Sequence, residues 1–188
     1  MKGLLIGIGV LVLIGFAVGG TLIGARNQLV TEKEAATAAY QQVDVDLQRR
    51  LDLIPNLVNT VKGFAQQEQT VINSVTSARA AMMGARTPNE RIAANQQLDT
   101  ALGRLFVVVE NYPELKSNEN FLNLQDELAG TENRIAVDRR RYNEALRTYN
   151  TDLQLFPNNI AASIFGLTRD EDYFTADQAA QQPPEVEF

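Results

Sequence analysis

The sequence contains no histidine and no cysteine. Histidine is the usual proton shuttle of enzymes, both residues are common metal ligands, and the cysteine thiolate is a common nucleophile. Their absence excludes a Ser-His-Asp triad and thiol catalysis, and we expect neither a metal ion nor another cofactor. The lack of disulfides does not indicate a compartment, because a helical domain can fold without them.

Charge is absent from residues 3–25, a run bounded by Lys2 and Arg26. As a helix rising about 1.5 Å per residue, this run is roughly 34 Å long, which is enough to cross a hydrocarbon core of about 30 Å. We therefore predict a single-pass protein of the cell membrane with its anchor in residues 1–26.

Two alternatives for this segment stay open. Residues 4–16 also resemble the apolar core of a cleaved signal peptide followed by small residues, although the apolar run continues past that site to Ala25. Basic residues near the two ends are almost balanced. We favour a cytoplasmic N-terminus with the domain outside the cytoplasm, and the opposite topology, with a cytoplasmic domain, remains an alternative.

Glycines in the apolar run form G-x-x-x-G pairs, which let helices approach closely in membranes. Self-association would explain them, although glycine is also simply frequent in membrane helices. We predict a homo-oligomer and take four glycines of the second and third pairs as interaction candidates: Gly15, Gly19, Gly20 and Gly24.

Acidic residues outnumber basic ones by 23 to 17, which gives a net charge of −6. This balance argues against nucleic acid as a partner and against broad attraction to anionic lipid. The partners that we expect are the lipid bilayer, further copies of the chain and a membrane protein.

Prolines and polar breaks divide residues 27–156 into four helical stretches. We predict helices over residues 27–53, from Pro55 to residue 83, from residue 88 to 109, and over residues 117–155. The first is expected to continue directly out of the membrane. The third begins with Thr87 and Glu90 at the spacing of a capping box.

Aromatic and aliphatic residues recur every seven positions in the last stretch, the spacing of a coiled-coil seam. The seam comprises Phe121, Leu128, Ile135, Tyr142, Tyr149 and Phe156. The predicted fold is all-α, with the N-terminal transmembrane helix continuing into an elongated antiparallel four-helix bundle in residues 27–156.

Two sequence blocks resemble the LemA family of membrane proteins. The first is QVDVDLQRRLDLIPNLV at residues 42–58 with its continuation to residue 65, and the second extends from Tyr112-Pro113-Glu114 to Phe156-Pro157. The resemblance implies one N-terminal membrane helix, a soluble antiparallel helical bundle, and relatives associated with membrane organisation, including bacterial magnetosome membranes. It implies no reaction.

Polar residues within the predicted helices suggest buried contacts between helices that fix their register. Paired carboxylates could also act as acid and base, but a carboxylate metal site in a bundle normally uses Glu-x-x-His, and many of these charges have the spacing of helix-surface pairs. We therefore predict that the protein is not an enzyme. The structural candidates are Arg49, Arg50, Asp52, Pro55, Asn56, Glu119, Asn120, Glu132 and Asn133.

Residues 157–188 form a tail with a short apolar patch followed by acidic residues and two prolines. Its end, with Val186 and Phe188, is suited to capture by a strand-adding pocket of a partner or neighbouring subunit. The alternative is a tail folded onto its own bundle.

The leading hypothesis is a non-enzymatic, self-associating membrane scaffold that organises the membrane or partner proteins. The alternative is an adaptor that presents its C-terminal tail to a membrane protease or another partner enzyme.

Overall fold

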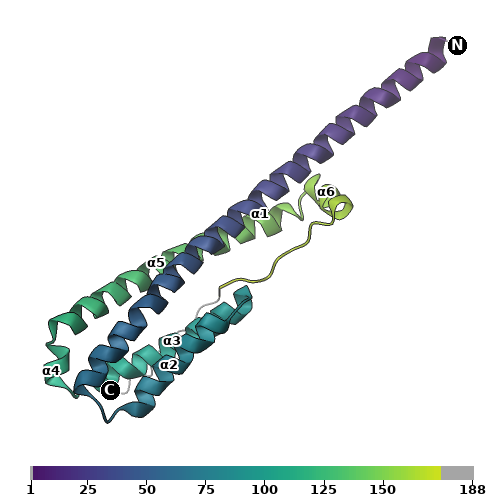
Figure 1. Cartoon of the computed structure of the whole chain (residues 1–188). Helices are drawn as coiled ribbons and strands as arrows, with labels where there is room; N and C mark the ends of the chain where they lie inside the picture. The colour runs from purple at the N-terminus through teal and green to yellow at the C-terminus, as the bar shows by residue number, and fades with distance from the viewer. Residues whose placement is uncertain (1, 175–188) are drawn as a thin grey trace, which may run out of the picture. The chain divides into compact units, whose positions relative to one another are not determined.

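The structure is a computed structural model that describes residues 2–174 (Figure 1). All regular elements of this part of the chain are helices, which confirms the predicted all-helical class. They are α1 (Lys2–Phe64), α2 (Gln69–Gly84), α3 (Pro88–Val109), α4 (Pro113–Lys116), α5 (Glu119–Asp152) and α6 (Asn158–Phe165).

The described residues divide into two compact units. The first unit comprises residues 2–41 with Arg140–Glu171, and the second comprises Gln42–Arg139 with residues 172–174. Helices α1 and α5 each contribute to both units. The predicted division at residues 26 and 156 stays a prediction.

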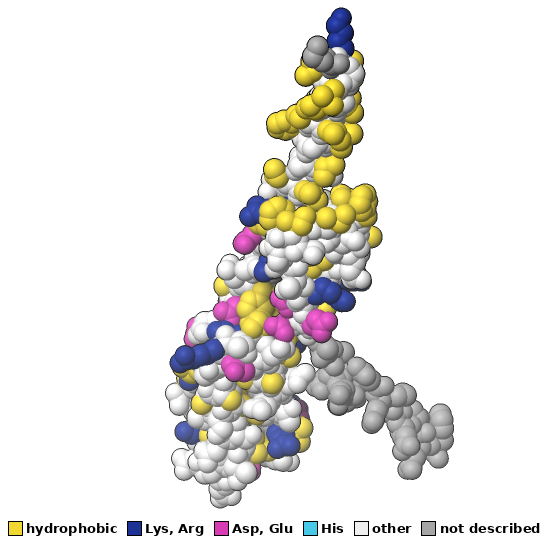
Figure 2. Space-filling view, turned by 90° about the vertical axis from the view of Figure 1, so that its right-hand side faces the viewer, with side chains coloured by type: hydrophobic (Ala, Val, Ile, Leu, Met, Phe, Trp, Pro, Cys, Tyr) yellow, Lys and Arg dark blue, Asp and Glu magenta, His cyan; other side chains and the backbone are white. Residues whose placement is uncertain are grey.

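The N-terminal part of α1 carries apolar side chains on its surface (Figure 2). Leu4 is 72% exposed and Phe16 is 77% exposed, and a basic side chain lies at the tip. This helix is the one candidate membrane span among the described residues, and we call residues 3–25 the apolar span. As expected, the helix continues past the span, because neither glycine nor proline interrupts residues 26–54.

Pro55 lies inside α1, so the prediction that a second helix begins there is wrong. Proline has no backbone N–H and therefore leaves the carbonyl group four residues earlier, that of Leu51, without its helical partner. Arg79 of α2 fills this position: its Nε donates a hydrogen bond of 3.0 Å to the Leu51 oxygen. The helix passes the proline because a side chain from another helix replaces the missing donor.

Helices α2 and α3 pack against each other in the second unit. The start of α3 is the capping box expected from the sequence: the Thr87 hydroxyl accepts from the Glu90 amide, and the Glu90 carboxylate accepts from the Thr87 amide. This reciprocal pair satisfies two of the free N–H groups at the start of the helix. Glu90 also accepts from the Arg86 amide, and these hydrogen bonds lower its pKa.

The predicted seam of α5 is buried from Phe121 through Tyr149. The helix is shorter than the predicted residues 117–155. It begins after Asn118, whose side chain accepts a hydrogen bond from the Phe121 amide, and its last residue is Asp152. Phe156, which was expected in the seam, therefore lies beyond the helix and is 79% exposed.

The chain after α5 folds back within the first unit. Helix α6 ends at Gly166, whose φ of 68° is the left-handed conformation that glycine adopts most easily. The Tyr149 hydroxyl then donates to the Thr168 carbonyl, and the Asn150 amide pairs with the backbone of Asp170. This part of the tail lies on its own chain, whereas Val186 and Phe188 lie outside the described residues.

Candidate functional site

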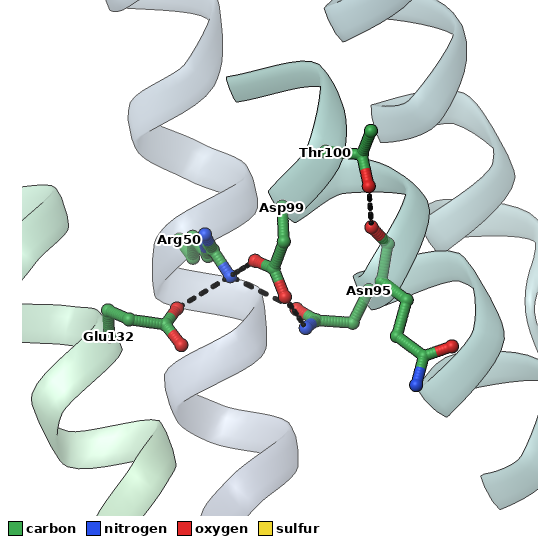
Figure 3. Close-up of polar contacts among 6 residues, drawn as sticks. Arg50, Asn95, Asp99, Thr100 and Glu132 are labelled. Atoms are coloured by element: carbon green, nitrogen blue, oxygen red, sulfur yellow. Dashed lines mark hydrogen bonds and ion pairs between the residues drawn. The ribbon is translucent and has the colours of Figure 1, made fainter. Parts of the chain in front are cut away.

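A network of charged and polar side chains lies inside the second unit (Figure 3). Arg50 of α1 is only 7% exposed, and its Nη1 is 2.6 Å from Oδ1 of Asp99 on α3 and 2.8 Å from Oε2 of Glu132 on α5. The same nitrogen donates to the side-chain oxygen of Asn95, and the Asn95 amide donates to Asp99. We call these four residues the ion network, and it connects three helices.

The charges around the network are balanced by a second arginine. Arg139 of α5 interacts electrostatically with Glu132 and Asp99, so two cations face two carboxylates. Its guanidinium lies 5.3 Å from the centre of the Phe174 ring. Burial is the main cause that lowers its pKa, and the nearby carboxylates oppose this shift.

Two more ion pairs involve the same stretch of α1. Asp44 pairs with Arg91 of α3, and Oδ1 of Asp46 lies 3.4 Å from Nε of Arg134 on α5. Residues 44–50 of α1 therefore place three charged side chains against α3 and α5. A slip of one of these helices along another would separate several of these pairs at once.

Asp46 is a buried carboxyl group of the second unit whose pKa is raised. Its side chain is 7% exposed, and the carboxyl group of Asp138, also buried, lies beside it. Burial raises the pKa of Asp46 first, and the Asp138 carboxyl raises it further, whereas Arg134 lowers it. The protonated form of Asp46 is thus favoured relative to a solvated aspartate.

The structure brings two predicted candidates, Arg50 and Glu132, into direct contact. It places the others differently: Asp52 accepts a hydrogen bond from Gln48 on the helix surface. The candidates with exposed side chains are Arg49, Asp52, Asn56, Glu119, Asn120 and Asn133. The explanation of Asn56, Asn120 and Asn133 by burial is therefore wrong, whereas Asn150, another asparagine within the last predicted helix, is buried and hydrogen-bonded.

Sequence reasoning missed Asn95, Asp99 and Arg139. The signal for the first two was present, because polar residues at positions 95 and 99 interrupt the apolar face formed by Leu98 and Leu102. Arg139 carried no such signal, since it lies in a run of three arginines that is typical of a solvated surface.

Two of the exposed candidates, Asn56 and Asn120, line a shallow groove of about 410 Å³ between α1 and α5. Amide side chains both donate and accept hydrogen bonds, so the groove suits groups that form hydrogen bonds. The other lining residues are Asn59, Thr60, Asn123, Leu124 and Glu127.

The predicted glycine candidates form an open surface on the apolar span. Gly15, Gly19 and Gly20 line a groove of about 480 Å³ together with Val12, Phe16 and Ile23. A Cβ atom built on any of these glycines, or on Gly24, would have no atom within 4 Å other than those of its chain neighbours and of the nearby backbone of its own helix. The small-residue surface is therefore not used for packing within the described chain.

The chemistry available in the ion network is that of ion pairing and hydrogen bonding. Within residues 2–174, no group of three or more acidic, histidine or cysteine side chains is arranged to hold a metal ion. The carboxylates of Asp99 and Glu132 both lie within ion-pair distance of Arg50.

These features define an all-helical membrane protein with an N-terminal apolar helix. The LemA family matches residues 39–188, and the chain belongs to this family. The match covers both of the sequence blocks on which the resemblance was based.

The relatives include magnetosome proteins. The chain is 30% identical to magnetosome protein MamQ 2 of Paramagnetospirillum magneticum, in an alignment that covers 87% of this chain and 69% of that protein. It is 29% identical to magnetosome protein MamQ of Magnetospirillum gryphiswaldense, with 96% and 75% covered. Protein LemA of Metamycoplasma hominis is 21% identical, with 77% and 67% covered.

Proposed function

We propose that the protein is a non-enzymatic, single-pass membrane scaffold that self-associates through its apolar span and organises the membrane or partner proteins. The observation that carries this proposal is the uncovered glycine groove of the span. Because lipid tails are as apolar as the helix, close packing of small residues is a main source of helix association in membranes. The similarity to magnetosome proteins supports a role at a membrane.

The finer architecture belongs to the same proposal. We expect parts of α1, α2, α3 and α5 to form an antiparallel four-helix bundle with coiled-coil packing along α5. Contacts within the second unit support this arrangement: Arg79 links α2 to α1, Arg50 links α1 to α3 and α5, and α2 packs on α3. The buried seven-residue seam supports the coiled-coil packing.

For the topology we propose a cytoplasmic N-terminus and a domain outside the cytoplasm. The absence of cysteine makes this testable, because Val107→Cys would introduce the only thiol at a side chain that is 70% exposed. A membrane-impermeant thiol reagent is expected to label this variant in intact cells. Labelling only after the cells are lysed would show the opposite topology.

The test of self-association is the mass of the full-length protein in a mild detergent, measured by light scattering after size-exclusion chromatography. We expect a complex several times larger than the chain of 20.8 kDa. The double variant Gly15→Leu/Gly19→Leu fills the groove and is expected to reduce the complex to smaller species. The control is Gly9→Leu, which makes the same change in the span outside the G-x-x-x-G pairs.

A monomeric wild-type protein would refute the scaffold. If that monomer formed a defined complex only after a partner protein was added, the adaptor function would replace it. An oligomer that is equally large in the Gly15→Leu/Gly19→Leu variant would show that the span does not drive assembly.

A further inference from the structure

Helix α6 has an apolar face that its own chain leaves exposed. Ile160 and Ile164 lie four residues apart in α6 and are 45% and 60% exposed. Residues four apart lie on the same side of a helix, so these side chains form one stripe. We call them the α6 apolar face. The opposite side is buried within the chain through Asn158, Ala161 and Ala162.

The position of α6 relative to the apolar span is given by contacts within the first unit. Arg26 is the first charged residue after the span, and its guanidinium lies 5.5 Å from the centre of the Phe165 ring at the end of α6. Ala25, the last residue of the span, is already buried. Helix α6 therefore lies beside α1 at the end of the span, as Figure 1 shows.

This end of the span is where the bilayer meets water. A charged residue that follows 23 uncharged ones marks the boundary, since its head group stays in the polar region. In Figure 2, hydrophobic side chains gather beside the first charged side chains that follow the apolar part of α1. The α6 apolar face thus continues the lipid-facing surface of the span.

We infer that the α6 apolar face is a second membrane contact, which inserts into the boundary between head groups and acyl chains of the bilayer that the span crosses. Short amphipathic helices bind membranes in this way through their buried apolar area. Since no residue of α6 is charged, the contact does not require anionic lipid. The inference rests on the membrane anchor and is independent of self-association.

The test uses the full-length protein with a nitroxide spin label at one engineered cysteine, because the natural chain has none. The label is placed by Ile164→Cys, or by Thr148→Cys as a control on an exposed side chain of α5 in the same unit. Both variants are reconstituted in phosphatidylcholine vesicles at low protein density. Collisions with oxygen, which concentrates in lipid, are compared with collisions with a water-soluble nickel complex.

We expect the ratio of oxygen to nickel accessibility to be several-fold higher for the I164C label than for the T148C label. Adding anionic phosphatidylglycerol should leave this ratio unchanged. Introducing Ile160→Glu beside the I164C label should lower the ratio several-fold. Helical circular dichroism should not change, because the Ile160 side chain is already partly exposed to the surroundings.

Equal nickel accessibility of the two labels would overturn the inference, because the α6 apolar face would then lie in water. A label at position 164 that is shielded from both reagents would also overturn it, since protein rather than lipid would cover the face. Shielding that occurs only with anionic lipid would show that charge, and not the α6 apolar face, makes the contact. These outcomes do not depend on the mass in detergent that tests the scaffold.

Discussion

Removing the buried cation of the ion network is the most informative change to the second unit. Arg50→Met keeps a long side chain in place but leaves Asp99 and Glu132 with Arg139 as the cation that interacts with both. The local charge changes from balanced to one excess negative charge. The folded protein should therefore lose stability through electrostatic imbalance more than through lost packing.

The magnitude follows from the distances and exposures. Two unit charges about 4 Å apart attract each other by about 4 kcal/mol at an effective dielectric constant near 20, before desolvation is subtracted. Breaking a fully buried pair costs about 3–5 kcal/mol. Because Asp99 is 31% exposed and Glu132 is 42% exposed, water recovers part of this loss. We expect a net cost of about 2 kcal/mol, or about 4–8 °C in melting temperature for a chain of this size.

A second variant separates charge balance from packing. In Arg50→Met/Glu132→Gln, Asp99 keeps Arg139 as its counter-ion and the local charge is balanced again. We expect the double variant to recover at least half of the lost melting temperature. The control Arg104→Met changes an exposed arginine of α3 and should be nearly neutral.

The assay is thermal unfolding of the full-length protein in mild detergent, followed by circular dichroism. An Arg50→Met variant as stable as the Arg104→Met control would refute the reasoning that the network stabilises the second unit. A double variant less stable than Arg50→Met alone would refute the role of charge balance.

Two more predictions use the same assay. Arg79→Met should lower the free energy of unfolding by about 1–2 kcal/mol, because it leaves the Leu51 carbonyl without a hydrogen-bond donor. The same change should cost less in a Pro55→Ala background, where the restored backbone amide binds that carbonyl. Equal costs in both backgrounds would disprove that Arg79 replaces the donor missing at Pro55. Because the folded pKa of Asp46 is raised, folding opposes its ionisation, and the contribution of Asp46 to the stability should rise as the pH falls from neutral towards the ordinary value of 3.8. Asp46→Asn should therefore alter the pH dependence of the melting temperature in this range. An unchanged pH dependence in Asp46→Asn would contradict the assigned burial.

Most of the fold follows from local sequence signals. The capping box at Thr87, the buried seam of α5 and the end of α6 at Gly166 all depend on residues close in sequence. Patterns of this kind predict where helices begin, end and face. The continuous α1 did not follow, because whether Pro55 ends a helix depends on Arg79, which lies 24 positions later and in another helix.

The candidate site was predictable only in part for the same reason. Arg50 and Glu132 were identified as structural residues, but their partner Asp99 was not, since the contact joins helices that sequence alone does not align. Asparagine inside a helix indicated burial correctly for Asn150 and wrongly for Asn133. An asparagine on a helix surface has the same helical propensity as one that is buried, so propensity alone cannot separate them.

Alkaline carbonate extraction of membranes from cells that express the full chain tests whether the apolar span holds the chain in a bilayer. The wild-type protein should stay in the membrane pellet. Leu11→Arg/Ile14→Arg, which places two charges within the span, should move protein to the supernatant. Release of the intact wild-type chain into the supernatant would show that the span is not embedded in the bilayer.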